Sequence, residues 1–181
     1  MKRILITTAF LAISSTEVFA QATTSATPTV AGALRRQWQT ITGYITKAAE
    51  QMPESDYAYK PTPQVRSFGE LIGHMAGAQD LICANALAET PKGGEDAVEK
   101  SAKTKAQLVA ALKASTQFCE RAYNQPDAGL SGATKLFGSD ATRLDALVTN
   151  TVHNGEHYGN IVTYMRMKGM VPPSSQPSTT P

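Results

Sequence analysis

Apolar residues recur every three or four positions in four stretches of the chain, which is the spacing of one face of an α-helix. The four stretches cover residues 30–52, 67–89, 104–119 and 139–169. The second and third stretches open with S-F-G-E and T-K-A-Q, which are the residue spacings of helix capping boxes. No run alternates apolar and polar residues with a period of two, so no strand is predicted. Four amphipathic helices of this length predict an all-α fold, a four-helix bundle.

The two ends of the chain have different patterns. Two basic residues, an apolar run over residues 4–13 and the small residue Ala20 predict a secretory signal peptide cleaved after Ala20. The apolar run is too short to cross a bilayer as a helix. Residues rich in Ser, Thr and Pro flank the predicted bundle and have too few apolar groups to order themselves. The predicted organisation is a signal peptide at 1–20, a flexible linker at 21–29, the bundle at 30–171 and a disordered tail at 172–181.

The charge balance narrows the class of partner. The full chain has 17 basic and 15 acidic residues, and removing the signal peptide takes away Lys2, Arg3 and Glu17. The mature chain is therefore nearly neutral and has no basic block, which argues against nucleic-acid binding. We expect an exported protein, periplasmic or extracellular, that does not sit in a membrane.

Candidate chemistry lies in "HNGEHYGN", residues 153–160, inside the fourth predicted helix. His153 and His157 are four residues apart, so their imidazoles lie on one helix face, one turn apart. His74, the third histidine, lies on an inward-facing stripe of the second helix. Zn²⁺ and Ni²⁺ accept neutral imidazole, and two histidines on one helix with a third from another can hold such an ion. The alternative is that the three are ordinary buried or exposed histidines.

Residues around the pair carry weaker signals. "HNGEH" also matches H-x-x-E-H, the inverted zincin pattern, in which the glutamate is a general base. That family takes its third ligand from a downstream acid, and no Asp or Glu follows His157. Glu156 also falls on the polar stripe, so a surface role is favoured. Three residues on the inward side, Asn150, Asn160 and Tyr164, are candidates to orient the imidazoles or are simply buried polar groups.

The two cysteines lie away from the histidines. Cys83 is nine residues beyond His74, on the opposite side of the helix, and Cys119 is on the third predicted helix. An even cysteine count in an exported protein favours a disulfide between Cys83 and Cys119. The alternative is two buried thiols that act as small apolar groups.

Two motifs carry a family resemblance. "RSFGELIGHMAGAQDLIC" at 66–83 and "HNGEHYGNIVTYMRMKGMVPPSS" at 153–175 resemble the DinB-like (DinB/YfiT-type) metalloenzymes. The resemblance covers essentially the whole mature chain and implies a four-helix bundle. It also implies a divalent metal bound by one histidine of the second helix and two of the last, which match His74, His153 and His157.

The resemblance leaves the activity open. Characterised members of the family include transferases and isomerases that use a thiol cosubstrate, and many members have no assigned reaction. We therefore expect an exported metal-binding protein that acts as a metal-dependent hydrolase or a thiol transferase on a small molecule. A binding protein for a metal or small ligand, without turnover, is the alternative, and an interaction protein with incidental histidines is a third. Catalytic residues are not identified, and a homodimer is plausible by analogy.

Overall fold

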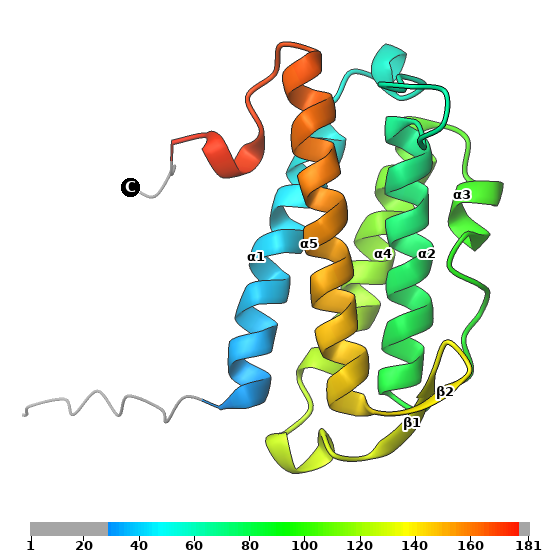
Figure 1. The fold of residues 1–181 in the computed structure, drawn as a ribbon, viewed down its shortest axis with the longest axis vertical. Coiled ribbons are helices and arrows are strands. Elements are labelled where there is room, and N and C mark those ends of the chain that lie inside the picture. Colours follow the sequence, from blue (N-terminus) through cyan, green and yellow to red (C-terminus); the bar gives the residue numbers. More distant parts are fainter. Residues whose placement is uncertain (1–28, 178–181) are drawn as a thin grey trace, which may run out of the picture.

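The computed structural model describes residues 29–177, and the predicted signal peptide and almost all of the predicted linker lie outside that range. Four long helices run side by side and form the predicted four-helix bundle, which is confirmed (Figure 1). They are α1 (Val30–Gln51), α2 (Phe68–Ala86), α4 (Lys105–Tyr123) and α5 (Arg143–Met167). The capping boxes predicted at Ser67 and Thr104 are both present.

The helices do not simply alternate in direction. The Lys105 ammonium, at the start of α4, donates to the carbonyl of Glu50 near the end of α1, so these two helices are antiparallel. Cys83 and Cys119, both late in their helices, are joined, so α2 and α4 run parallel. A parallel neighbour requires a long return connection, and here that connection contains a short helix, α3 (Ala97–Ser101).

Glycines let this connection lie directly on α2. A Cβ at Gly77 would overlap the carbonyl oxygen of Glu95, and one at Gly73 would come within 2.7 Å of the Glu99 Cα. Since such contacts do not occur between real Cβ atoms and backbone, α3 approaches α2 only because these two positions have no side chain. The backbone around Asp96 is thereby brought against the middle of α2.

Two groups of apolar side chains fill the bundle. One surrounds Phe68, Ile72 and Met165 at the end where α2 begins, and the other surrounds Trp38 and Ile82 at the opposite end.

At the start of α2, Lys60 donates a hydrogen bond to Glu70, and this bond and the capping bonds to Ser67 lower the pKa of Glu70 to about 2. Among the described residues, no helix is long and apolar enough to cross a membrane.

The expectation of no strands is wrong for one stretch. A two-stranded antiparallel hairpin of β1 (Ala133–Leu136) and β2 (Ser139–Thr142) precedes α5. Its turn, Phe137-Gly138, has positive φ at both residues, as a tight hairpin turn requires. Because the strands are short and none of their residues is buried, their sequence shows no alternation. The hairpin also moves the start of the last helix: the fourth apolar stretch was predicted to begin at residue 139, whereas α5 is capped by Thr142.

Short 3₁₀ turns complete the described chain, and one of them corrects the predicted tail. They are η1 (Glu54–Asp56), η2 (Asp127–Gly129) and η3 (Pro173–Ser175). The backbone N–H of Ser174 donates to the Tyr158 hydroxyl at 2.9 Å, and Pro173 is buried. The tail was predicted to be disordered from residue 172, but it packs on α5 at least through η3 because proline is rigid and apolar. Residues 178–181 of that predicted tail lie outside the described range.

Candidate metal centre

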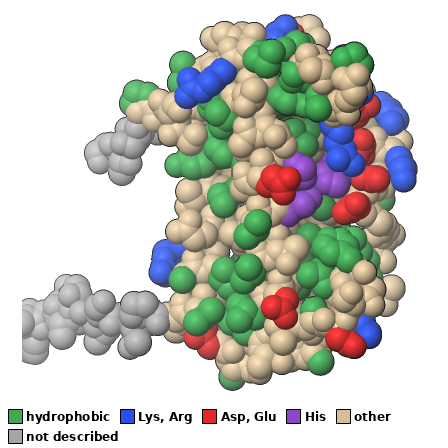
Figure 2. All heavy atoms as spheres, viewed as in Figure 1, with side chains coloured by type: hydrophobic (Ala, Val, Ile, Leu, Met, Phe, Trp, Pro, Cys, Tyr) green, Lys and Arg blue, Asp and Glu red, His purple; other side chains and the backbone are tan. Residues whose placement is uncertain are grey.

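The three histidines converge between α2 and α5. His74 and His157 each place Nε2 3.1 Å from Nε2 of His153. One nitrogen from each ring lies within 4.8 Å of the other two. His153 and His157 are partly exposed and His74 is buried. Histidine atoms are visible at the surface beside acidic and basic side chains (Figure 2). The structure thus brings together the three residues that the sequence singled out as metal ligands.

The environment of His153 and His157 favours the uncharged form of these two rings. Burial, reinforced by the charge of His153, lowers the pKa of His157 to about 4. Burial also lowers the pKa of His153, and the neighbouring His74 lowers it further. His74 itself is 5% exposed. At neutral pH His153 and His157 are therefore unprotonated and have lone pairs to donate, which is the form that binds metal ions.

The tautomer of His74 follows from a contact on its other side. Its Nδ1 lies 3.0 Å from Oδ1 of Asp96. A carboxylate can only accept a hydrogen bond, so in neutral His74 the ring proton is on Nδ1 and the lone pair is on Nε2. That lone pair faces Nε2 of His153 at 3.1 Å. Asp96 therefore orients His74 in the way that carboxylates orient metal-binding histidines.

Hydrogen bonds between the three imidazole rings do not account for both short contacts of His153. In a neutral ring, Nε2 of His153 has either one proton or one lone pair, yet it lies 3.1 Å from two other Nε2 atoms. It can pair with only one of them. Three nitrogens bound to one ion at 2.0 to 2.1 Å would be about 2.8 to 3.4 Å apart, depending on the coordination geometry. The two distances to His153 fall in this range, and all three nitrogens lie within 4.8 Å of one another. The donor set therefore fits a divalent metal ion that takes one lone pair from each ring.

Asp96 is the residue that sequence reasoning missed. It lies in "PKGGED", which has no helical period, and only the glycines of α2 indicate that this segment packs closely. The hydrogen bond from His74 lowers the pKa of Asp96, and the positive charge of Arg66 lowers it further. The Arg66 guanidinium also bonds to Glu99 at 3.0 Å. His74, Asp96 and Glu99 form a second set of candidate metal ligands. The two carboxylates of this set already bind a cation, the guanidinium of Arg66.

The three residues predicted to support the imidazoles lie in different places. The Asn160 amide is 3.4 Å from Nδ1 of His157. The Tyr164 hydroxyl donates to the backbone carbonyl of Arg66 at 2.8 Å, close to the residues that hold Asp96. Asn150 points instead at the sulfur atoms of the two cysteines. Asn160 is therefore the one of the three in contact with an imidazole.

A groove opens beside His157. It has a volume of about 720 Å³ and lies between α5, the start of α2 and the connection over residues 60–66. Its charged groups are already paired, since Lys60 bonds to Glu70 and Arg66 bonds to Glu99. Polar groups of α5 on its wall are His157, Asn160, Thr163 and Tyr164. A small molecule in this groove would lie against His157, the histidine of the cluster that lines it.

Glu156 does not belong to the cluster. Its side chain is exposed. Among the described residues, the set of candidate metal ligands that contains His153 and His157 does not include Glu156. The structure therefore gives no support to the inverted zincin interpretation of "HNGEH".

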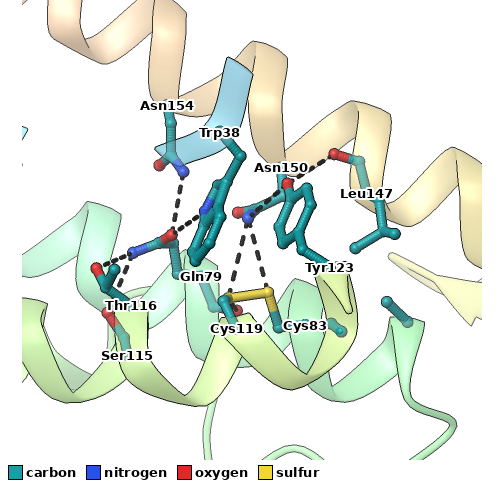
Figure 3. Close-up of a disulfide and its surroundings, with 12 residues drawn as sticks. Trp38, Gln79, Cys83, Ser115, Thr116, Cys119, Tyr123, Leu147, Asn150 and Asn154 are labelled. Atoms are coloured by element: carbon teal, nitrogen blue, oxygen red, sulfur yellow. Dashed lines mark hydrogen bonds between the residues drawn. A yellow bond between two sulfur atoms is a disulfide. The ribbon is translucent and has the colours of Figure 1, made fainter. Parts of the chain in front are cut away.

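The cysteines form a separate, buried feature. Cys83 of α2 and Cys119 of α4 are joined in a disulfide whose Cα atoms are 5.3 Å apart, and both side chains are fully buried. The bridge is next to Asn150 rather than the histidines (Figure 3). Since it has no surface access, its role is to link two helices rather than to react.

Comparisons with known proteins agree with this architecture. The family model described as the DinB superfamily matches residues 33–161. The chain belongs to the DinB superfamily. A DinB-like protein from Bacillus cereus has a similar structure, with a TM-score of 0.66, 17% identity, and coverage of 77% of this chain and 93% of that protein. A second, from Bacillus subtilis, has a TM-score of 0.52 and 21% identity, covering 81% and 99%.

One similar structure belongs to a named enzyme. It is a mutant of a mycothiol-dependent maleylpyruvate isomerase, with a TM-score of 0.57 and 14% identity, covering 74% of this chain and 65% of the isomerase. At these identities the likeness concerns the fold. No curated protein matches the chain significantly.

Proposed function

We propose that this chain binds one divalent transition metal ion, Zn²⁺ or Ni²⁺, through His74, His153 and His157, and that it is an exported metal-dependent hydrolase or thiol-dependent transferase. The observation that carries the proposal is that Nε2 of His153 lies 3.1 Å from Nε2 of both His74 and His157, two contacts that hydrogen bonds alone do not both satisfy. Family membership adds weight, because metal binding is common in DinB-like proteins.

The chemistry follows from the ligand set. When bound by three neutral imidazoles, a divalent ion keeps its full charge and supplies acidification of water or a thiol and polarisation of a carbonyl group. Asp96 holds the His74 lone pair toward the centre through its hydrogen bond to Nδ1. The groove positions a small molecule beside His157, where the amide of Asn160 and the hydroxyl of Tyr164 are available to orient it.

Export is part of the proposal. The apolar run and the small residue at the cleavage point support a signal peptide removed after Ala20. The Cys83–Cys119 disulfide also supports it, because disulfides persist in oxidising compartments such as the periplasm and the extracellular space.

The test is the metal content of the mature protein, purified without a histidine tag, after equilibration with Zn²⁺ or Ni²⁺ and gel filtration. We expect about one equivalent by inductively coupled plasma mass spectrometry. His74→Ala and His153→Ala should lose it while keeping their helical circular dichroism. Glu156→Gln is the matched control and should bind as the wild type does. An empty wild type, or histidine variants that bind equally well, would refute the proposal.

A second measurement separates an enzyme from a binding protein. Co²⁺ in place of the native ion gives visible absorption bands that report its ligands. If a coordination position is open, adding azide or a small thiol will change these bands, as an enzyme requires. Unchanged bands would show a closed coordination shell and favour the binding protein without turnover.

A further inference from the structure

A buried glutamine contacts all three of the other long helices. Gln79 of α2 is 1% exposed, and its amide oxygen accepts from the Trp38 indole of α1 at 2.9 Å. The same oxygen accepts from the Asn154 amide of α5 at 3.2 Å. Its amide nitrogen donates to the hydroxyls of Ser115 and Thr116 of α4. Figure 3 shows these contacts meeting at the single Gln79 side chain.

The direction of every bond in this cluster is determined. An indole N–H can only donate, so the atom of Gln79 that faces Trp38 must be the oxygen. The hydroxyls of Ser115 and Thr116 give their protons to the carbonyl of Leu112, so they accept from the Gln79 amide. The Gln79 amide thus uses both acceptor and both donor positions. A one-residue shift of any helix would break at least one bond and leave a buried polar group without a partner.

A second contact level lies one turn along α2. Cys83 is four residues after Gln79, and Cys119 is four residues after Ser115, so the disulfide repeats the same alignment of α2 with α4. On α5, Asn150 is four residues before Asn154, and its amide donates toward the sulfur of Cys83 at 3.6 Å. Two successive turns of α2 therefore meet two successive turns of α5.

The α5 residues that meet these two levels are next to the metal-site histidines. Asn154 directly follows His153, and Gln79 is five residues from His74. Whatever fixes Asn154 against Gln79 also fixes His153 and His157 against His74. Apolar contacts alone would tolerate small shifts between α2 and α5, whereas buried polar contacts that demand partners select one register.

We infer that Gln79 is a positioning residue for the histidine site: through Asn154 it sets the register of α5 on α2 and thereby brings His153 and His157 opposite His74. This inference rests on the proposed function only for its effect on metal binding. The register itself is a property of the metal-free bundle.

The experiment replaces Gln79 with methionine, which has nearly the same shape but cannot make these bonds. In Gln79→Met we expect the dissociation constant for Co²⁺ to rise at least tenfold and the absorption bands to change, while the far-ultraviolet circular dichroism stays helical. The matched control is Thr42→Val, because Thr42 is equally buried but bonds only within α1. That variant should keep the wild-type affinity and bands.

A merely structural role predicts a different result. Gln79→Met would then unfold at a lower temperature but bind Co²⁺ with the wild-type affinity and bands, and the inference would be overturned. The double variant Gln79→Met/Asn154→Leu separates the loss of stability from the loss of affinity, because it also removes the Asn154 amide that the single variant leaves without a partner. It should regain part of the lost thermal stability but not the lost affinity; recovery of both would count against a register role.

A metal-independent readout keeps the inference separate from the proposed function. The rings of His74 and His157 have centroids 5.0 Å apart, so their ring protons should give a nuclear Overhauser effect in the metal-free wild type. Loss of this signal in Gln79→Met, with the control unchanged, would support the register role even if the wild type bound no metal. Retention of the signal would refute it.

Discussion

Replacing Asp96 tests whether this carboxylate orients His74 for metal binding. In Asp96→Ala the ring of His74 loses the acceptor that holds its proton on Nδ1. Hydrogen bonds to a charged partner contribute about 1.5 to 3 kcal/mol. Because a third of the Asp96 side chain is exposed, solvent screening weakens this hydrogen bond, and we expect its contribution at the lower end of that energy range. About 1.4 kcal/mol corresponds to a tenfold weaker affinity, which is at the low end of measured effects for such residues.

The assay is a competition titration of Zn²⁺ between the protein and a chelating dye at pH 7.5. Asp96→Asn keeps an oxygen that accepts from Nδ1, so we expect its dissociation constant to rise only about threefold, against about tenfold for alanine. Lys100→Ala is the control, because its ammonium is 3.9 Å from the other oxygen of Asp96 and is mostly exposed. Equal affinities for wild type and Asp96→Ala would refute the assignment of Asp96 as the orienting residue.

Three further outcomes follow from the packing. Replacing both Cys83 and Cys119 with alanine should lower the free energy of unfolding by about 4 kcal/mol, because the bridge joins residues 36 apart in sequence; an unchanged denaturation midpoint would contradict this. Gly77→Ala should destabilise the protein by about 1 to 3 kcal/mol in thermal melts, because the new Cβ overlaps the backbone before α3. Gly43→Ala, with open space around the new Cβ, should raise the free energy of unfolding by up to about 1 kcal/mol. A stability change of the same sign in both variants would show that packing around the glycine does not determine the effect. Because its ion pair and capping bonds lower the pKa of Glu70 to about 2, its stabilisation is complete above pH 4.5 and is lost as the pH falls toward 2; Glu70→Gln should therefore be less stable than wild type at pH 7 and equal to it near pH 2 in urea titrations.

The sequence predicted the features that depend on local spacing. The four long helices follow from apolar periodicity, and the boxes at Ser67 and Thr104 are where their residue spacing indicated. The placement of His153 and His157 on one turn also follows from a four-residue interval. Their meeting with His74 required the further inference that two inward faces oppose each other.

What the sequence did not predict depends on contacts between distant segments. The short strands around Phe137-Gly138 have no buried residue, so no alternation of apolar and polar residues marks them. Asp96 reaches His74 because Gly73 and Gly77 allow the connection to lie on α2, and no local pattern shows that approach. Asn150 was grouped with the histidines because it shares their stripe on α5, but it lies further along the helix, where it faces the disulfide. A helical wheel does not resolve such positions along the axis.

The most direct test of the account is anomalous X-ray diffraction from a crystal of the mature protein grown with Zn²⁺, recorded above and below the zinc absorption edge. The account predicts one strong peak between α2 and α5, about 2.0 to 2.1 Å from Nε2 of His74, His153 and His157. A crystal that contains zinc only at other surface positions, with the three rings bonded to no ion, would contradict it.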